Sequence, residues 1–354
     1  MKADVVGPAG NRLHPPEWRM ILLYRKLILL LALVALATAC GDTAATEPVA
    51  EGTSVTAVPT TTVAPPTTEK APTSTSAPPA FPVVVTAANG PIEIPARPAA
   101  IVSMSATHTE MLYAIGAGEQ IVAVDAFSNY PPEAPLTELT GFSPNVEAII
   151  GYDTDLVVTD GDWDGSSMGT LSELGVPVLI LPAAATLDDV YAEIETLGSA
   201  TGHTSEAIAL VMDMKTEIDD LISSLPQQSE PPTFSHELDA SYYSVTSETF
   251  IGHIYSLMGL ENIADAVGDE SFGYPQLSEE YILQQDPDLI FLADTICCDT
   301  SAATLAQRPG WDTLTAVNNG SVVELNDDIS SRWGPRIVDH ISAVARAVTA
   351  FADD

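Results

Sequence analysis

The chain has 354 residues, of which 46% are hydrophobic, so it is long enough for two ordinary domains with a sizeable core. It carries 12 Lys and Arg against 49 Asp and Glu, a formal net charge of −37 at pH 7. A surface this negative repels nucleic acid, so we expect no nucleic-acid partner.

The N-terminal segment has the pattern of an export leader. Arg25 and Lys26 precede the apolar run LILLLALVALATAC, which is too short to span a bilayer comfortably. Its last residues, Leu36 to Cys40, resemble a bacterial lipobox, in which the cysteine is lipidated and becomes the new N-terminus. We expect a lipoprotein signal peptide over residues 1–39 and a lipid anchor at Cys40. An ordinary secretory signal is the alternative.

The segment that follows is a predicted tether. Residues 40–80 contain the anchor cysteine and then mostly Thr, Pro, Ala, Ser and Val, with almost no large apolar side chain. Such a composition cannot bury enough surface to offset chain entropy. We expect a disordered tether that spans roughly 35 Å as a random coil. The protein should therefore be exported and held at the outer face of the cell membrane.

Residues 81–203 predict a first α/β lobe. Two short strands around an Asn89-Gly90 turn come first. Apolar, β-branched strands at 99–105, 120–125, 155–160 and 176–182 then alternate with helices at 107–118, 145–152 and 168–175. In the first of these helices, Thr107 and Glu110 have the spacing of a capping box. The alternation is typical of a parallel α/β sheet.

A long helix and a second α/β lobe complete the chain. Residues 204–225 form a helical pattern without internal Gly or Pro, and residues 226–354 form the second lobe. There we expect extended segments at 237–245, 288–294 and 320–326, and helices at 249–259, 279–285, 304–311 and 335–351.

Two stretches of the sequence echo each other, one in each lobe. The stretch SPNVEAIIGYDTDLVV from Ser143 matches LSEEYILQQDPDLIFL from Leu277, with Glu147 aligned to Glu280. Two similar lobes joined by one helix follow from this repeat. Ligands of α/β lobes bind outside the carboxyl ends of the strands, so we expect a ligand cleft between the lobes.

Four segments carry a resemblance to a known family: residues 99–135, 145–158, 308–328 and 331–341. They resemble the substrate-binding lipoproteins of ABC importers for vitamin B12, ferric siderophores and haem. The resemblance implies two Rossmann-like lobes with central parallel sheets, joined by one long rigid α-helix. It also implies a binding protein that passes a metal chelate, a ferric siderophore or cobalamin, to an ABC permease dimer with its ATPase. One lipid-tethered monomer suffices for this role, and we expect no cofactor.

The resemblance assigns a role to the two echoed glutamates. In the vitamin B12-binding relatives, one surface Glu of each lobe docks into arginines of the permease, and Glu147 and Glu280 match these positions. Both are expected in the first turn of a helix, where the helix dipole favours a carboxylate. An exposed carboxylate can form a bidentate pair with Arg. The alternative is that both residues only stabilise their helices.

Candidate ligand residues come from the loops that follow the strands. Aromatic side chains suit a large flat ligand, and the resemblance implies Asp328 and Arg332 as ligand contacts. Only seven Lys and Arg lie after residue 39, so we expect Arg332 to have a specific role. The alternative is that Arg332 pairs with a nearby carboxylate, as we expect for Arg336. If the ligand is haem, Tyr243 or His108 could be the axial ligand. The full set of candidates is Ser105, His108, Phe127, Tyr130, Phe142, Asp160, Trp163, Tyr243, Thr246, Asp328, Arg332 and Trp333.

Adjacent cysteines stand just after a predicted strand of the second lobe. In an exported protein Cys297 and Cys298 could form a vicinal disulfide, which would stiffen the loop at the cleft or respond to redox conditions. Two free thiols are the alternative.

Other functions have weaker support in the sequence. There is no Gly-x-Ser-x-Gly, His-Glu-x-x-His or Walker-type loop, so we do not expect an enzyme. The histidines form no short ligand-spaced pair, and we expect no resident metal ion, although a bare transition metal stays open as cargo. A tethered receptor without a permease is a further alternative.

Overall fold

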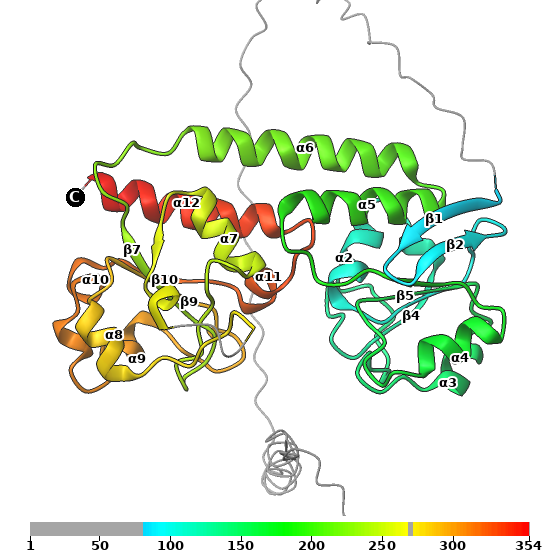
Figure 1. The fold of residues 1–354 in the computed structure, drawn as a ribbon, viewed down its shortest axis with the longest axis horizontal. Helices are drawn as coiled ribbons and strands as arrows, with labels where there is room; N and C mark the ends of the chain where they lie inside the picture. The colour runs from blue at the N-terminus through cyan, green and yellow to red at the C-terminus, as the bar shows by residue number, and fades with distance from the viewer. Residues whose placement is uncertain (1–80, 268–271, 354) are drawn as a thin grey trace, which may run out of the picture. The chain divides into compact units, whose positions relative to one another are not determined.

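Two parallel four-stranded sheets, one in each lobe, organise the computed structural model (Figure 1). The structure describes residues 81–267 and 272–353. The predicted signal peptide, the anchor at Cys40 and the tether lie outside the described residues and stay predictions. None of the helices in the described part of the chain combines the length and apolar character that crossing a bilayer requires.

The N-terminal lobe begins with an antiparallel hairpin, β1 (Val83–Ala87) and β2 (Gly90–Ile94). Its sheet has the order β4-β3-β5-β6. The strands are β3 (Ile101–Ser103), β4 (Ile121–Val124), β5 (Leu156–Thr159) and β6 (Val178–Ile180). The helices are α2 (Ala106–Ala114), η2 (Gly118–Gln120), α3 (Val146–Ile150), α4 (Ser167–Glu173) and α5 (Leu187–Thr201).

The C-terminal lobe repeats this plan with the strand order β10-β9-β7-β8. The strands are β7 (Thr233–Glu237), β8 (Glu261–Asn262), β9 (Leu289–Leu292) and β10 (Val322–Glu324). The helices are α7 (Phe250–Leu257), η3 (Ile263–Val267), α8 (Glu279–Gln285), α9 (Ala302–Leu305), η4 (Trp311–Thr313), α10 (Thr315–Asn319), α11 (Asp327–Ser331) and α12 (Ile337–Asp353). The predicted fold class, two α/β lobes with parallel sheets, is confirmed.

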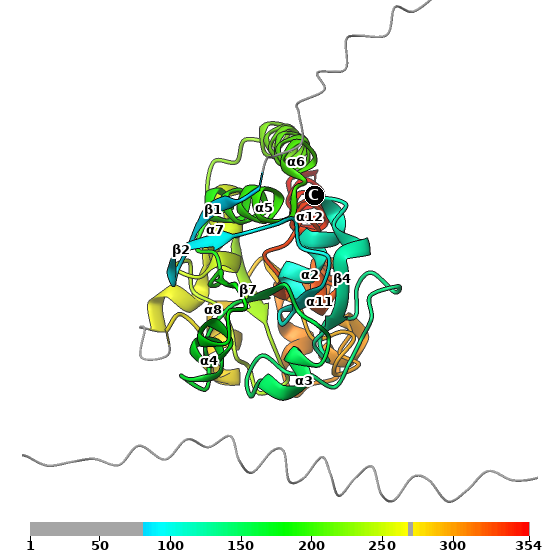
Figure 2. The same cartoon turned by 90° about the vertical axis from the view of Figure 1, so that its right-hand side faces the viewer.

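The long helix α6 (Thr204–Ser223) runs over both lobes and packs on α5 of the first and α12 of the second (Figures 1 and 2). Its buried face consists of Ala207, Val211, Met214 and Ile218. Gly198 of α5 lets the two helices approach closely, because a Cβ there would collide with Ala207. One apolar cluster therefore continues from the first lobe through α5, α6 and α12 into the second. The opposite face of each sheet has a cluster of its own.

Three local predictions were wrong. Helix α2 begins after Ser105 rather than Thr107, and Glu110 does not cap it. The first strand of the second lobe is Thr233–Glu237 and not 237–245. Helix α9 ends at Leu305, because Pro309 lies too close to continue it.

Helix α5 is absent from the predicted elements. Its N-cap Thr186 forms a capping box with Asp189, and burial of its apolar face under α6 stabilises it. The Thr-x-x-Asp pattern at residues 186–189 was the available signal.

The echoed sequences have equivalent structures. Asp155 accepts hydrogen bonds from two backbone N–H groups just before β3, and Asp288 accepts from the N–H and hydroxyl of Thr233 at the start of β7. Asp153 and Asp286 both have a left-handed backbone, with φ of 53° and 45°. In each lobe these aspartates fix where a central strand begins, so this part of the repeat is structural.

Two histidines of the second lobe are buried between β7 and α12. His236 of β7 and His340 of α12 both pack against Tyr255, each with its ring centroid 5.6 Å from that of the tyrosine, and the Tyr255 hydroxyl is 2.8 Å from Nδ1 of His236. Burial lowers the pKa of His340 to about 4, and burial together with the nearby His340 lowers the pKa of His236 to about 3. Both rings are therefore neutral in the folded protein near neutral pH.

This pair predicts a loss of stability in mild acid. Between pH 6.5, the ordinary pKa of both rings, and about 4, the unfolded chain binds more protons than the folded protein. The free energy of unfolding should therefore fall with pH in this window, by about 1 kcal/mol per pH unit for each histidine. His340→Gln should make the slope shallower by about that amount, as measured by denaturant unfolding at a series of pH values. An unchanged slope in this variant would contradict the assignment.

Candidate functional site

A hollow of about 440 Å³ lies at the carboxyl ends of the N-terminal lobe's strands, where the segment after β10 closes it from the other lobe. Its volume is in the range of small-molecule sites. Eight of the twelve candidate ligand residues line it: Ser105, Phe127, Phe142, Asp160, Trp163, Asp328, Arg332 and Trp333.

One wall of the hollow is an exposed aromatic surface made of Phe127, Phe142 and Trp163. The ring centroids of Phe127 and Phe142 are 6.3 Å apart, and those of Phe142 and Trp163 are 5.9 Å apart. More than half of each side chain is exposed: 58%, 65% and 59% respectively. Trp163 is held in place by a hydrogen bond from its indole N–H to Asp160 at 2.9 Å. Three large aromatic groups gathered at one exposed spot are typical of a binding surface.

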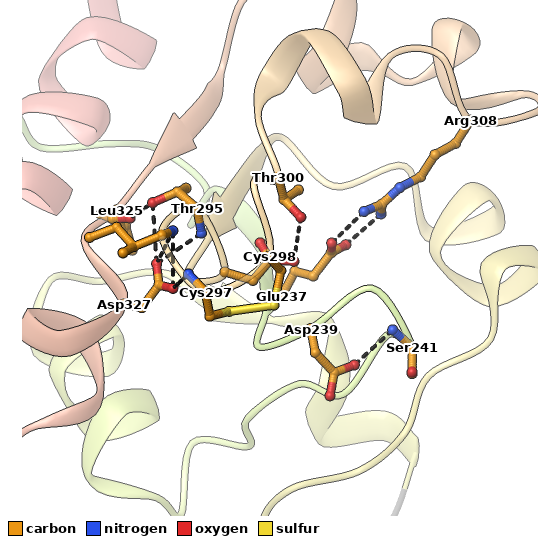
Figure 3. Close-up of a disulfide and its surroundings, with 12 residues drawn as sticks. Glu237, Asp239, Ser241, Thr295, Cys297, Cys298, Thr300, Arg308, Leu325 and Asp327 are labelled. Carbon is orange, nitrogen blue, oxygen red and sulfur yellow. Dashed lines mark hydrogen bonds and ion pairs between the residues drawn. A yellow bond between two sulfur atoms is a disulfide. The ribbon is translucent and has the colours of Figure 1, made fainter. Parts of the chain in front are cut away.

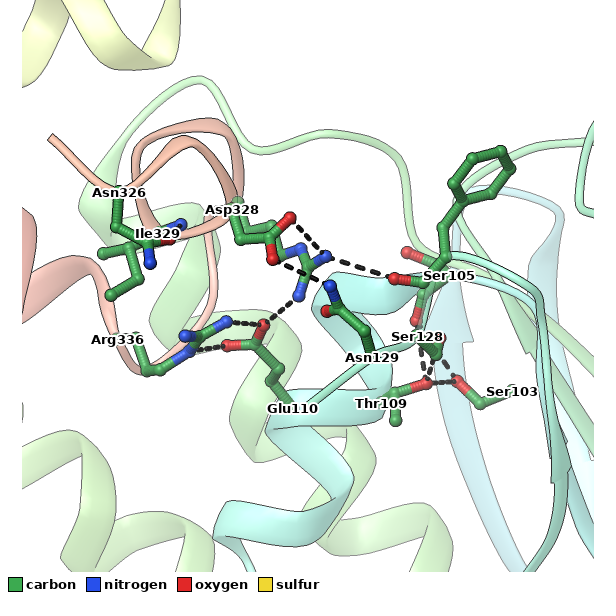
Figure 4. A network of polar contacts seen from close by, with 12 residues as sticks. Ser103, Ser105, Thr109, Glu110, Ser128, Asn129, Asn326, Asp328, Ile329 and Arg336 are labelled. Carbon is green, nitrogen blue, oxygen red and sulfur yellow. Dashed lines mark hydrogen bonds and ion pairs between the residues drawn. The ribbon is translucent and has the colours of Figure 1, made fainter. Parts of the chain in front are cut away.

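Another part of the lining, Asp328 and Arg332, belongs to an ion-pair cluster that joins the lobes (Figure 4). Glu110 of α2, which is 3% exposed, accepts hydrogen bonds from Arg332 at 2.7 Å and from Arg336 at 2.7 and 2.5 Å. The hydrogen bonds to Glu110 raise the pKa of Arg336. Glu110 belongs to the first lobe, and both arginines follow α11 in the second, so these ion pairs connect the lobes. We call Glu110, Arg332 and Arg336 together the Glu110 clamp. The salt bridge expected for Arg336 is confirmed.

Further contacts extend the Glu110 clamp. Arg332 also donates to Asp328 at 2.9 Å and to the carbonyl of Phe127 at 3.1 Å. Asn129, in the same loop as Phe127, donates to Asp328 at 2.8 Å. Arg332 therefore borders the hollow, but its guanidinium is already paired with the protein.

The structure removes His108 from the hollow. Its side chain is fully buried, and Nε2 lies 3.4 Å from Glu193 of α5. The indole N–H of Trp333 donates to the same carboxylate at 2.9 Å. His108 follows Thr107, which does line the hollow, and the helical rotation between neighbours turns it inward. The prediction of His108 as a ligand residue, or as an axial haem ligand, is contradicted by this burial.

Three other candidates also lie outside the hollow. Tyr130 packs under the guanidinium of Arg336, 4.0 Å from its ring centroid. Thr246 is 5% exposed, and Tyr243 lies against Gln276 in the second lobe. The predictions for these residues followed from their places after strands, but the loops carry them away from the hollow.

The sequence reasoning missed Asp125 and Glu110. Asp125 lines the hollow at 3% exposure, and Ser128 donates to it at 2.5 Å. Burial raises the pKa of Asp125. Its position at the end of the predicted strand 120–125, like that of Asp160 after 155–160, was a usable signal. Glu110 gave no such signal, because its arginine partners are more than 220 residues away.

The carboxyl end of the second lobe's sheet carries a second ion pair and a disulfide (Figure 3). Arg308 binds Glu237 through two hydrogen bonds of 2.6 Å, while burial raises the pKa of Glu237. Cys297 and Cys298 form a disulfide in the loop after β9. Among the described residues, no group of three or more His, Cys, Asp or Glu side chains is arranged to hold a metal ion.

The echoed glutamates are exposed on the two lobes. Glu147 lies in the first turn of α3, which Asn145 caps, and Glu280 in the first turn of α8, which Ser278 caps. Within residues 81–267 and 272–353, neither carboxylate has a hydrogen-bond or salt-bridge partner. Helices α3 and α8 lie in different lobes, on the side away from α6 (Figures 1 and 2).

Comparisons with known proteins agree with this architecture. Residues 101–329 match the periplasmic binding protein family. A Bacillus subtilis protein named as an ABC transporter substrate-binding lipoprotein is 28% identical over 277 residues, covering 76% of this chain and 86% of that protein. A cobalamin-binding protein of Halobacterium salinarum is 31% identical over 278 residues, covering 76% of this chain and 74% of that protein.

Solved structures show the same fold. The vitamin B12-binding protein of Vibrio cholerae superposes with a TM-score of 0.60 at 24% identity, over 73% of this chain and 99% of that chain. A periplasmic haem-binding protein of Roseiflexus superposes with a TM-score of 0.63 at 22% identity, over 72% and 99% of the two chains.

Proposed function

The chain belongs to the periplasmic binding protein family, and from this premise we propose that it is the solute-binding protein of an ABC importer. It acts outside the cell membrane, where it captures a small-molecule metal chelate in the hollow between the lobes. Cobalamin or a ferric siderophore is the proposed ligand, and binding rather than catalysis is the proposed activity.

The observation that carries this proposal is the aromatic wall of Phe127, Phe142 and Trp163. These side chains leave more than half of their surface exposed, so a ligand that covers them would bury apolar area without first breaking protein contacts. Flat conjugated systems, such as a corrin or the aromatic groups of some siderophores, match such a surface. The similarity to the Halobacterium salinarum cobalamin-binding protein supports cobalamin in particular.

Haem is the second candidate ligand, because two of the proteins with similar solved structures are named as haem-binding. The described lining of the hollow contains no His, Cys or Tyr, and its one methionine, Met104, is 2% exposed. These are the side chains that usually hold haem iron. The hollow therefore favours a chelate whose metal needs no ligand from the protein.

The ligand class is tested by titrating the purified chain with cyanocobalamin, ferric siderophores and haemin. Binding should change the absorbance of the chelate and quench the fluorescence of Trp163. Phe142→Ala should weaken the binding of whichever chelate binds about tenfold or more, since it removes a stacking contact that contributes roughly 1.4 kcal/mol to binding.

Tyr152→Ala is the matched control, because Tyr152 is also an exposed aromatic residue of the first lobe but does not line the hollow. It should leave the affinity unchanged. Equal losses in both variants, or no binding of any chelate at micromolar concentration, would overturn the proposal.

We propose further that Glu147 and Glu280 dock the loaded protein on its permease. Each is an exposed carboxylate in the first turn of a capped helix, free of partners in the described chain, and there is one in each lobe. A permease with two equivalent subunits could then present an arginine to each lobe in the same way.

The docking proposal predicts separate effects on transport and on ligand binding. Replacing both residues by Arg should reduce cellular uptake of the chelate about tenfold or more, through like-charge repulsion, while affinity in solution stays unchanged. The matched control is Glu195→Arg with Glu217→Arg, the same charge change at exposed sites on α5 and α6. Normal uptake by the Glu147/Glu280 variant, or an equal loss in the control, would contradict the docking role.

A further inference from the structure

The loop after β9 contains the Cys297–Cys298 disulfide (Figure 3). Both cysteines are exposed, and the preceding Ile296 is 60% exposed. The next residue, Asp299, has φ of 55°, a left-handed conformation that is uncommon outside glycine. The disulfide joins neighbouring residues, so its ring includes the peptide bond between them and restricts the backbone of the loop tip.

This loop has a firmly closed base. Thr300 donates through its hydroxyl to Asp294 at 2.7 Å and through its N–H to the Asp294 carbonyl at 3.3 Å. Asp294 itself is fully buried at the end of β9. These contacts close a short loop of residues 295–299 that lies outside the sheet.

One flank of the loop is bound to the start of α11. Asp327, the first residue of that helix, accepts hydrogen bonds from the N–H groups of Thr295 at 2.8 Å, Ile296 at 3.0 Å and Cys297 at 2.6 Å. Three successive N–H groups can converge on one carboxylate only while the backbone between them keeps its shape. The third of them belongs to the disulfide itself.

The far end of α11 enters the Glu110 clamp. Asp328 follows Asp327 directly and is bound by Asn129 of the first lobe and by Arg332. Arg332 is the C-cap residue directly after α11 and pairs with Glu110. A continuous chain of bonded groups thus runs from the disulfide through a five-residue helix to the contact between the lobes.

We propose that the Cys297–Cys298 disulfide is a thiol–disulfide exchange site for a dithiol reductant outside the membrane, and that its redox state controls how firmly α11 is held against the first lobe. The oxidised loop presents its N–H groups to Asp327 and keeps α11 in place. The reduced loop loses the ring and holds Asp327 less well. Because α11 and the residue after it line the hollow, the exchange acts on the binding site.

The exchange is a two-step, two-electron reaction. A thiolate of the partner attacks the sulfur of one cysteine, the S–S bond breaks, and the released sulfur takes up a proton. The second thiol of the partner then attacks the mixed disulfide and releases the other cysteine, which also takes up a proton. The partner ends as a disulfide, and two electrons and two protons have passed to this chain. Because both cysteines are exposed residues, the loop tip is open to an approaching thiolate.

The first part of the test is native-state reduction of the full chain, with dithiothreitol as the dithiol. Free thiols are trapped by iodoacetamide without denaturant, and the peptide containing Cys297 and Cys298 is analysed by mass spectrometry. We expect two alkyl groups on this peptide after reduction and none before it. A disulfide that resists the reductant in the folded protein, but is reduced in the denatured one, would overturn the exchange site.

The second part measures amide hydrogen exchange in the oxidised and reduced proteins. Reduction should speed exchange of residues 295–297 about tenfold or more, and should also speed exchange in α11. Cys297→Ser with Cys298→Ser should match the reduced protein and should not respond to dithiothreitol. An effect confined to residues 295–299, or a double variant that behaves like the oxidised protein, would overturn the control of α11.

Asp327→Asn tests the proposed connection. Its disulfide remains, but the amide is a weaker acceptor for the three N–H groups, so reduction should no longer change exchange in α11. Asp312→Asn, the same change at an exposed position of η4, should leave the response intact. Equal responses in the two variants would contradict a path through Asp327. None of these measurements requires the ligand, so they can fail independently of the proposed transport function.

Discussion

The polar contact between the two lobes depends on a single buried carboxylate, that of Glu110. It is 3% exposed and is shared by Arg332 and Arg336, in a chain with only seven Lys and Arg after residue 39. Burying these charges is costly unless each is paired, so the arrangement is stable only with all three side chains in place. The Glu110 clamp therefore fixes the segment that follows α11, and with it one wall of the hollow.

Two kinds of contact join the lobes, apolar packing and the Glu110 clamp. The shared cluster beneath α6 connects the lobes along one edge, and the clamp connects them next to the hollow. The lobes are therefore joined by apolar packing at one place and by ion pairs at the other. The aromatic wall belongs wholly to the first lobe, so a ligand can meet it without first separating the lobes. This arrangement favours a preformed site over one assembled by large closure.

The fold was predictable because its signals are local. Alternating strands and capped helices follow from short patterns, and even the echoed aspartates have matching structural roles at the starts of β3 and β7. The site was only partly predictable. Position after a strand identified Phe142 and Trp163, but could not say that His108 turns inward. Glu110 looked like a capping residue, because the arginines that bind it come from the other end of the chain. Local spacing carries no information about such distant partners.

The most direct test of the Glu110 clamp is a double-mutant cycle between Glu110→Gln and Arg336→Gln, measured as free energies of unfolding in denaturant. If the clamp is the contact that joins the lobes, the two changes should be strongly non-additive, with a coupling energy of at least about 2 kcal/mol. Additive effects, with a coupling energy within about 0.5 kcal/mol of zero, would mean that this pair contributes nothing specific to joining the lobes and would contradict the account.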